Sequence, residues 1–286
     1  MPGKLYLTGT PIGNLGDLSP RCAETLEAAD FIAAEDTRVT MKLLNYLDLH
    51  KPLVSYYEHN ARVSGPRIVE RILAGENCAI VTDAGMPAIS DPGEDLVRLC
   101  AEAGIEIVGV PGPSAVVTAL ALSGLPTGRF TFEGFLAVNR KTRLEHLASL
   151  KDEKRTMVFY EAPHKLRNTL DDLQDAFGGE RRMALCREMT KLHEETLRMT
   201  VEEARAYYAE NEPRGEYVLV VEGAPERDEA PDETSALKKV AELVENGMSA
   251  RDAVRQTAEE CHINRSALYR AYQQAKAETE ETEETE

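Results

Sequence analysis

The sequence predicts an α/β protein built from two α/β domains, because short apolar runs alternate with helical patterns along most of its length. In the first half, each apolar run leads into a loop and then a helix, which is typical of a largely parallel sheet in three layers. After a Pro/Gly break at residues 125–128 the pattern changes, so the second sheet is expected to be more mixed.

Local signals place the elements of the first half. The predicted strands are residues 5–7, 30–34, 53–55, 79–81 and 105–110. Ser19 and Pro20 predict the start of the first helix, with Ser as the N-cap and Pro in the first turn. Helices are then expected over residues 37–46 and 63–73, and Gly75 ends the second of them.

The second half divides into an α/β part and a helical end. Its predicted strands are residues 130–135, 156–160, 183–186, 196–200 and 217–221, and its predicted helices are 140–150, 165–177 and 201–210. The expected domains are an N-terminal domain over 1–125, a second domain over 126–223, a linker over 224–234, a helical region over 235–276 and a disordered acidic tail over 277–286.

The helical region has the pattern of a helix-turn-helix. Helices are expected over residues 236–245, 250–261 and 266–276, and a short connection at residues 262–264 separates the last two. Arg265 and Arg270 belong to the second helix of this motif. Contact with nucleic acid and a small appendage that packs on protein are equally compatible with such a pattern.

Composition limits the function classes. The chain has 286 residues, with 33 Lys plus Arg against 50 Asp plus Glu and a formal net charge of −17. This charge repels polyanions, so a nucleic-acid partner requires a local basic patch, and DNA is not expected. The five cysteines are scattered without a CxxC pair, which predicts reduced thiols and no metal site. Without a signal peptide or an apolar run of ~18 residues, we expect a soluble, cytoplasmic protein with no membrane partner.

Three loops rich in Gly, Pro and Asp are expected at the carboxyl ends of the strands, where open α/β sheets bind ligands. The first, residues 8–17, lacks both the GxGxxG spacing and a Gly-Lys-Ser/Thr, which counts against dinucleotide and P-loop binding. The second, residues 82–93, is longer than an ordinary βα turn, which favours a function over a rigid turn. The third, residues 111–115, joins the fifth strand to a helix.

The second and third loops suit a small zwitterionic ligand. Asp83 supplies a carboxylate for an ammonium group, and Gly85 lets backbone N–H groups approach a carboxylate closely. Ser114 is placed to cap the helix that follows the third loop, and the amides there favour electron-rich groups.

A series of separated motifs makes the sequence recognisable. They are TPIGNLGD at 10–17, AAEDTR at 33–38, EHN at 58–60, TDAGMPAISDPG at 82–93, PGPSA at 111–115, GLP at 124–126, FEGFL at 132–136, FYEAPHK at 159–165, REMTK at 187–191 and GEYVLVVEG at 215–223. In this order they resemble the tetrapyrrole methylase superfamily, and within it the enzymes that methylate small-subunit ribosomal RNA.

The resemblance implies a fold, a cofactor and a partner. The fold is two α/β domains of the tetrapyrrole methylase type with S-adenosylmethionine in the interdomain cleft, in a chain that forms a homodimer. The reaction is methylation of the ribose 2′-hydroxyl of a cytidine in the decoding region of 16S (small-subunit) ribosomal RNA, within the 30S subunit. The implied cofactor-binding residues are Pro11, Asp83, Ala84, Gly85, Met86, Pro87, Ser114, Ala115, Glu161, Ala162, Tyr217 and Val218.

Two other functions remain open from the sequence. One is a small-molecule methyltransferase of the tetrapyrrole type, although the first loop departs from the GxGPGD pattern of the porphyrin-pathway enzymes, which counts against it. The other is a binding protein that uses the same cleft without catalysis.

Methyl transfer to a hydroxyl requires alignment of two atoms and a group that takes the proton. Glu35 and Asp36 follow the second strand and are candidates for that base, with Arg38 as a candidate to grip a phosphate. Asp36 is equally well placed to cap the next helix and pair with Arg38. His59 is a further candidate because histidine titrates near neutrality.

An acidic protein that binds RNA needs exposed cations near its site. The candidates are Arg140, Lys141, Arg143, Lys191, Arg265 and Arg270. The run over residues 140–143 follows the FEGFL motif and is the strongest of them, against the alternative of an ordinary solvated helix face.

Overall fold

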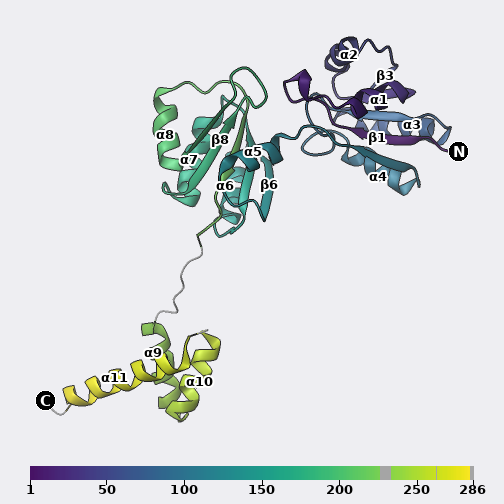
Figure 1. Ribbon diagram of the computed structural model, residues 1–286. Coiled ribbons are helices and arrows are strands. Elements are labelled where there is room, and N and C mark those ends of the chain that lie inside the picture. Colours follow the sequence, from purple (N-terminus) through teal and green to yellow (C-terminus); the bar gives the residue numbers. More distant parts are fainter. Residues whose placement is uncertain (226–232, 262, 284–286) are drawn as a thin grey trace. The chain divides into compact units, whose positions relative to one another are not determined.

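The computed structural model describes residues 1–225, 233–261 and 263–283. They form two compact units, a first over Met1–Gly223 and a second that begins at Ala224 (Figure 1). The first unit contains two five-stranded sheets with helices around them, so the predicted α/β class is confirmed. None of the described helices is both long and apolar enough to cross a membrane.

The first sheet is entirely parallel. Its strands are β1 (Lys4–Thr8), β2 (Phe31–Ala34), β3 (Leu53–Ser55), β4 (Cys78–Val81) and β5 (Glu106–Val110), in the order β3-β2-β4-β1-β5. Every residue of β2 and β4 is buried, which is expected for strands covered on both faces.

Helices cover both faces of this sheet. The helices are α1 (Pro20–Ala28), α2 (Thr37–Tyr46), α3 (Ala61–Leu73) and α4 (Glu94–Glu102). One core joins Leu26 of α1 and Leu44 of α2 to the sheet, and another joins Ile68 of α3 and Leu96 of α4 to it. The local signals act as predicted: the hydroxyl of Ser19 accepts a hydrogen bond from the backbone N–H of Cys22 at the start of α1.

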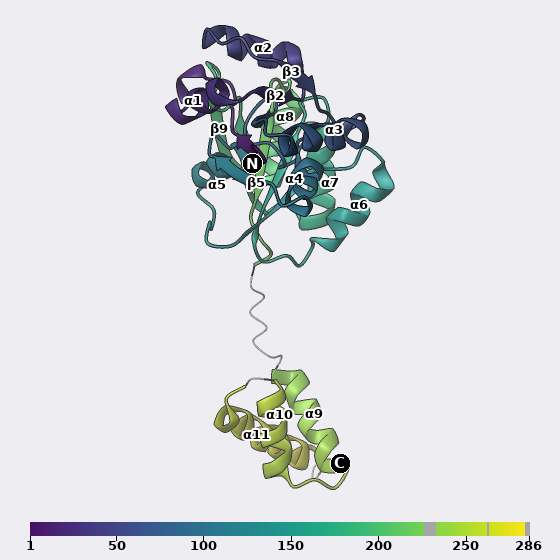
Figure 2. The same ribbon diagram turned by 90° about the vertical axis from the view of Figure 1, so that its right-hand side faces the viewer.

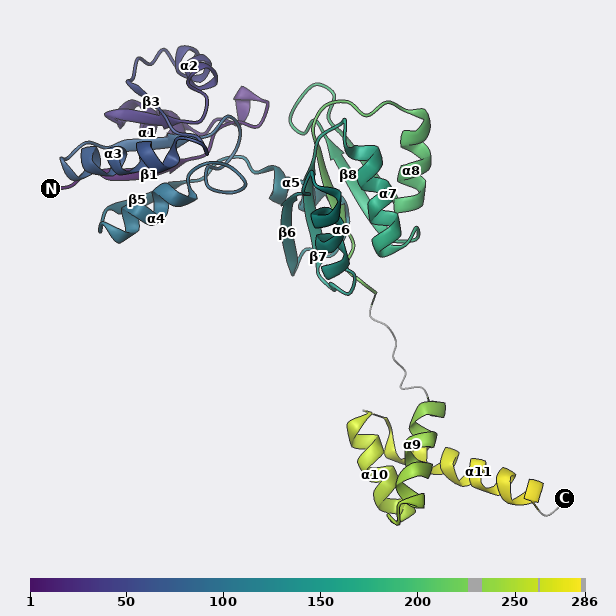
Figure 3. The ribbon, with the colours of Figure 1, turned by 180° about the vertical axis from the view of Figure 1, so that it is seen from behind.

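The second sheet is mixed, as the sequence predicts. Its strands are β6 (Phe130–Phe135), β7 (Thr156–Glu161), β8 (Arg182–Arg187), β9 (Glu195–Thr200) and β10 (Tyr217–Val221), in the order β6-β7-β10-β8-β9. Strands β6 and β7 pair in parallel, and the other three pairs are antiparallel. The helices α6 (Arg140–Ser149), α7 (Leu166–Phe177) and α8 (Val201–Glu210) pack on one face (Figure 3).

The opposite face of the second sheet is covered by α5 (Ala115–Ser123). Val116, Ala119 and Leu120 of this helix pack against Ala184 and Val218 of the sheet. Helix α5 thus packs on the second sheet although it lies before the predicted domain boundary at residue 125. The segment AVVTALALS has almost no polar face, so its sequence pattern does not indicate which sheet it covers.

The described residues of the second unit form three helices with a core of their own (Figure 2). They are α9 (Glu233–Glu245), α10 (Ala250–Glu260) and α11 (Arg265–Glu283). The predicted end of the last helix at residue 276 is corrected, since α11 continues to Glu283 through Ala and Glu residues, which are good helix formers. The centre of the predicted linker (226–232), His262 of the predicted turn, and the tail residues 284–286 lie outside the described residues.

Candidate active site

The strand register brings the three predicted loops together at one edge of the first sheet. Thr8 of β1 pairs with Val110 of β5, and Leu7 pairs with Ile80 of β4. The loops that follow these strands therefore start side by side. The first and second loops are joined by a short bridge, in which Thr10 N–H donates to the Gly85 carbonyl at 2.9 Å and Gly85 N–H donates to the Thr10 carbonyl at 3.2 Å.

The first and third loops touch at two glycines. A Cβ atom on Gly112 would lie 2.7 Å from both the carbonyl carbon and the oxygen of Gly9, and a Cβ on Gly9 would lie 2.7 Å from the backbone of Gly112. Both distances are shorter than a carbon side chain tolerates. Glycine at these positions lets the two loops cross in contact.

A cavity of about 860 Å³ lies between these loops and the second sheet. From the first half of the chain it is lined by Ile12, Ala84, Gly85, Met86, Ile89, Ser90, Asp91, Ser114, Ala115, Val116 and Val117. From the second half it is lined by Phe130, Phe132, Phe135, Tyr160, Glu161, Ala162, Pro163, Glu188, Met189, Lys191, Glu216, Tyr217 and Val218. Most of the cofactor-binding residues predicted from the sequence are in these two sets. Pro11, Asp83 and Pro87 are not, and the first loop contributes Ile12 instead.

An aromatic wall of this cavity was not anticipated from the sequence. Tyr160 of β7 contacts Phe132 and Phe135 of β6, with ring centroids 5.1 and 5.3 Å apart. The phenylalanines belong to the motif FTFEGF, whose alternation predicted the strand but not that its aromatic residues border a cavity. Such rings offer flat apolar faces and attract cations.

The first turn of α5 also borders the cavity. Ser114 occupies the predicted N-cap position, yet among residues 1–225 no N–H of the first turn donates to its hydroxyl. The predicted capping bond is thus absent from the described part of the chain, and both the hydroxyl and the first amides of α5 are available to a ligand. In contrast, the N–H of Gly85 donates to the carbonyl of Thr10 and is not available to a ligand.

A second cavity, of about 570 Å³, adjoins the first. It is lined by Glu35, Tyr56, Tyr57, Glu58, His59, Ala61, Ala88, Ser90, Asp91, Pro92, Gly93, Glu94 and Asp95. It therefore contains Glu35 and His59, which the sequence singled out, but neither Asp36 nor Arg38. Ser90 and Asp91 line both cavities.

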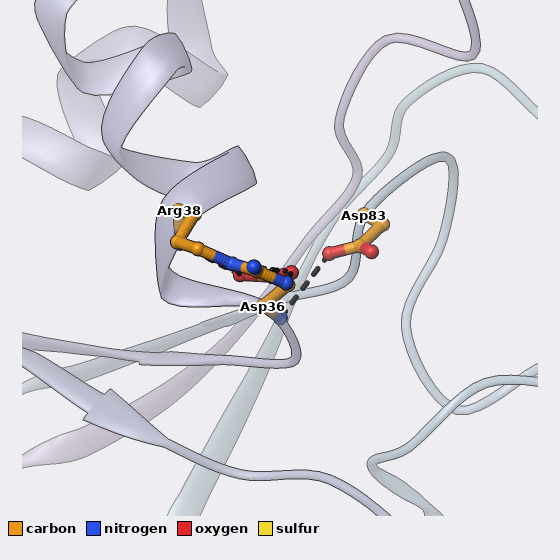
Figure 4. Close-up of polar contacts among 3 residues, drawn as sticks. All are labelled: Asp36, Arg38 and Asp83. Carbon is orange, nitrogen blue, oxygen red and sulfur yellow. Dashed lines mark hydrogen bonds and ion pairs between the residues drawn. The ribbon is translucent and has the colours of Figure 1, made fainter.

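Glu35 and Asp83 tie two loops together at the carboxyl ends of β2 and β4. The Asp83 carboxylate accepts a hydrogen bond from Asp36 N–H at 3.2 Å (Figure 4). The Glu35 carboxylate accepts one from Asp83 N–H at 3.3 Å. Partial burial raises the pKa of both carboxyl groups, and for Glu35 the neighbouring charge of Asp83 adds to the effect. The structure thus gives Asp83 a contact with the backbone of β2's loop rather than a place in the larger cavity.

Asp36 and Arg38 form a local pair at the start of α2. The Asp36 carboxylate accepts from the backbone N–H of Arg38 at 2.8 Å and from its guanidinium at 2.5 Å (Figure 4). The hydrogen bonds from the Arg38 side chain and backbone lower the pKa of Asp36 to about 2. An acid of that strength is a poor proton acceptor near neutral pH, so the geometry supports the capping alternative for Asp36.

Ser90 and Asp91, the two residues that line both cavities, belong to a tight turn. The N–H of Ala88 donates to the carbonyl of Pro92 at 3.3 Å, which closes a loop with Ile89, Ser90 and Asp91 at its tip. Ala88 and Ser90 both have left-handed backbone angles, with φ of 70° and 60°. Non-glycine residues in this region cost ~1–2 kcal/mol each, and such strain is concentrated at functional sites.

Two of the predicted RNA-binding side chains, Arg143 and Lys191, have acidic partners within the protein. Arg143 is 16% exposed and forms an ion pair with the buried Asp172 at 2.6 Å, a geometry that favours a structural role between α6 and α7 over an RNA contact. Lys191 lines the larger cavity and donates to Glu188 and Glu216 at 2.9 Å each. Arg140 and Lys141 are exposed on α6, whereas Arg265 and Arg270 are exposed in the second unit.

Comparisons with known proteins agree with this geometry. A family model described as tetrapyrrole (corrin/porphyrin) methylases matches residues 4–205. A protein of Synechocystis named ribosomal RNA small subunit methyltransferase I is 47% identical over 268 residues, which cover 93% of this chain and 96% of the relative. A Bacillus subtilis protein of the same name is 40% identical over 275 residues, with 94% of each chain covered.

Solved structures share the fold at lower identity. A uroporphyrin-III-C-methyltransferase from Thermus thermophilus matches with a TM-score of 0.54 and 22% identity, over 77% of this chain and 94% of that one. A diphthine synthase matches with a TM-score of 0.58 and 12% identity, over 77% and 90%. At such identities the similarity concerns the fold alone.

Proposed function

Because the chain belongs to the ribosomal RNA small subunit methyltransferase I family, within the tetrapyrrole methylases, we propose that it methylates a cytidine of small-subunit ribosomal RNA. The donor is S-adenosylmethionine, the acceptor is the ribose 2′-hydroxyl, and the target lies in the decoding region of 16S RNA within the 30S subunit. The enzyme acts in the cytoplasm. The relatives support an RNA methyltransferase activity. The methyl donor, the acceptor oxygen on the ribose and the target nucleotide are what we propose.

The larger cavity has the chemistry that the donor requires. The rings of Phe132, Phe135 and Tyr160 suit an adenine ring and the positive charge of a sulfonium. The free hydroxyl of Ser114 and the first amides of α5 suit a carboxylate. Its volume of about 860 Å³ also falls within the range of ~300–1,000 Å³ that is usual for cofactor pockets. These features support S-adenosylmethionine in this cavity.

The smaller cavity suits the acceptor nucleoside. Tyr57 is 41% exposed and offers a ring on which a base can stack, next to His59 at a centroid distance of 6.2 Å. Carboxylates such as those of Glu58 and Asp95 accept hydrogen bonds from the exocyclic amine of cytosine. The observation that carries the proposal is that the two cavities share one wall, where donor and acceptor can meet.

The candidate catalytic residues take different roles in this proposal. Glu35 and His59 line the acceptor cavity and contact the nucleoside. Asp36 and Arg38 form a pair outside both cavities, in which the 87% exposed Arg38 side chain is available to a phosphate of the RNA. Alignment of the two reacting atoms supplies ~7–11 kcal/mol of the barrier in reactions of this kind.

A methyl-transfer assay with labelled S-adenosylmethionine tests the proposal. We expect label in small ribosomal subunits that lack the modification, and nuclease digestion followed by mass spectrometry should find it on the ribose of a cytidine. Label only in a porphyrinoid would favour the small-molecule alternative. Donor binding by calorimetry without transfer to any acceptor would favour a binding protein.

Charge removal on α6 should weaken RNA binding without affecting the donor. Replacing Arg140 and Lys141 together by Ala removes two exposed cations beside the FEGFL motif. We expect a severalfold higher KM for small subunits and a salt dependence whose log–log slope falls by roughly 1–2, since each lost phosphate contact lowers it by about one.

A two-charge control distinguishes a local contact from a change in net charge. Lys4 and Arg182 lie at the amino ends of β1 and β8, away from the loops of the site, and are partly exposed. Replacing both by Ala should leave the KM for small subunits and the slope of the salt dependence unchanged. An equal loss in the two double variants would contradict a specific RNA surface on α6.

The homodimer that the family resemblance implies is a further prediction. Light scattering of the full chain checks it directly, because the monomer has a mass of 31.6 kDa. A monomer at micromolar concentration would contradict it.

A further inference from the structure

The carboxylate of Asp91 stands where the two cavities meet. It lies at the tip of the loop closed by the hydrogen bond between Ala88 and Pro92, and it lines both the donor cavity and the acceptor cavity. Ser90 is the other residue that lines both, and its hydroxyl is not a base near neutral pH.

The loop tip is held across from the second sheet. A Cβ atom built on Gly134 of β6 would lie 3.2 Å from the Ser90 hydroxyl, which places the tip against the aromatic wall. Tyr160, on the same wall, is close enough to feel the charge of Asp91. Burial, together with that charge, raises the pKa of Tyr160 to about 12. Asp91 therefore lies where the donor cavity, the acceptor cavity and the region near Tyr160 meet.

Asp91 also differs from the neighbouring acids in its partners. Glu35 accepts the N–H of Asp83, Asp83 accepts the N–H of Asp36, and Asp36 is paired with Arg38. Within the described part of the chain, no donor makes a hydrogen bond or ion pair with the Asp91 side chain. A half-buried carboxylate that nothing neutralises is costly to the fold, and such groups are concentrated where a reaction uses them.

We propose that Asp91 is the catalytic base, which takes the proton of the acceptor hydroxyl during methyl transfer. This inference rests on the proposed function. The hydroxyl oxygen forms a bond to the methyl carbon, the bond between that carbon and the sulfonium sulfur breaks, and its electron pair stays on the sulfur as a neutral thioether. The hydroxyl proton passes to the Asp91 carboxylate, from which solvent removes it after the product leaves.

The acid strength of Asp91 fits this role. Burial, together with the charges of Glu35 and Asp83, raises the pKa of Asp91 to about 6. It is therefore ionised at neutral pH while being a stronger base than an ordinary aspartate. The other titratable groups that line the two cavities are Tyr160, Glu161, Glu188, Lys191, Glu216 and Tyr217 on the donor side and Tyr56, Tyr57, Glu58, His59, Glu94 and Asp95 on the acceptor side.

The first test compares the full-length wild type with Asp91→Asn on small ribosomal subunits that lack the modification. The wild-type turnover should fall as the pH drops below about 6, because protonation removes the base. Asp91→Asn should lower turnover by roughly 100- to 10,000-fold and lose this acid limb. Its affinity for S-adenosylmethionine, measured by calorimetry, should fall far less than its turnover, since the amide keeps the size of the side chain and Asp91 is one of many residues that line the donor cavity.

A second readout does not depend on activity. Because the folded pKa of Asp91 lies above the ordinary value of 3.8, the folded state binds the extra proton and ionisation destabilises it as the pH rises from about 4 through 6. Asp91→Asn should therefore melt at a higher temperature than the wild type at pH 8, and the difference should vanish near pH 4.

A matched control and the contrary outcomes complete the test. Glu102→Gln removes a carboxylate from the far end of α4, outside both cavities, and should change neither turnover nor the acid limb. If the wild type is active and Asp91→Asn keeps its turnover within about threefold, or keeps the acid limb, Asp91 is not the base. The proposed function would still stand. A wild type that transfers no methyl group to RNA overturns the proposed function, and the assignment with it.

Discussion

Replacing Gly112 by Ala is expected to remove donor binding, because the new methyl group would lie 2.7 Å from the carbonyl group of Gly9. These Gly9 atoms belong to the backbone and not to a flexible side chain that could turn away. The first and third loops must therefore move apart. Ser114 and Ala115, which border the donor cavity, follow Gly112 after a single residue, Pro113, and would move with it. We expect a loss of at least ~10-fold in affinity for S-adenosylmethionine and a decrease of ~1–3 kcal/mol in the free energy of unfolding.

Gly109→Ala is the matched control for this variant. Gly109 lies on β5 just before the same loop, and among the described residues nothing lies within 4 Å of a Cβ atom built there. Its replacement should leave donor affinity unchanged, as measured by calorimetry. If Gly112→Ala binds the donor as tightly as Gly109→Ala does, the contact between the two loops does not shape the cavity.

Replacing Arg143 by Ala is expected to destabilise the fold more than it affects RNA binding. Its guanidinium pairs with Asp172, which is 5% exposed, and also donates to the carbonyls of Ala137 and Val138 at 3.4 Å each. Without the arginine, a buried carboxylate is left without its cation. Such a loss costs ~3–5 kcal/mol, which urea unfolding measures directly.

The neighbouring residue on α7 provides a control for this prediction. Asp171 forms the same kind of pair with Arg205, but these side chains are 57% and 38% exposed. Arg205→Ala should therefore lower the free energy of unfolding by only ~0–1 kcal/mol. A stable Arg143→Ala variant with a raised KM for small subunits would instead support the RNA contact that the sequence indicated.

The candidate site illustrates how far local patterns reach. The loops at residues 82–93 and 111–115 were found because Gly, Pro and Asp gather at the ends of apolar runs, and both loops border the donor cavity. The pattern could not show that the side chain of Asp83 turns toward the backbone of Asp36, since that contact joins residues from two strands. For the same reason the local pattern singles out the carboxylates that follow β2 but not Asp91, which lies near the end of the motif at 82–93.

The sequence by itself determined the elements and the family. Helix α2 and strand β3 have the predicted bounds, because caps, apolar periods and turn residues act over a few neighbouring positions. The ordered motifs indicated the tetrapyrrole methylase fold, which the family model and the relatives confirm.

The tertiary structure decided which surfaces meet. It assigned α5 to the second sheet, paired Arg143 with the buried Asp172, lined the donor cavity with the aromatic residues of β6, and placed Asp91 where the two cavities meet. Each of these depends on contacts between residues that lie far apart in the chain. Strand register and packing create such contacts, and a local sequence pattern carries no record of them.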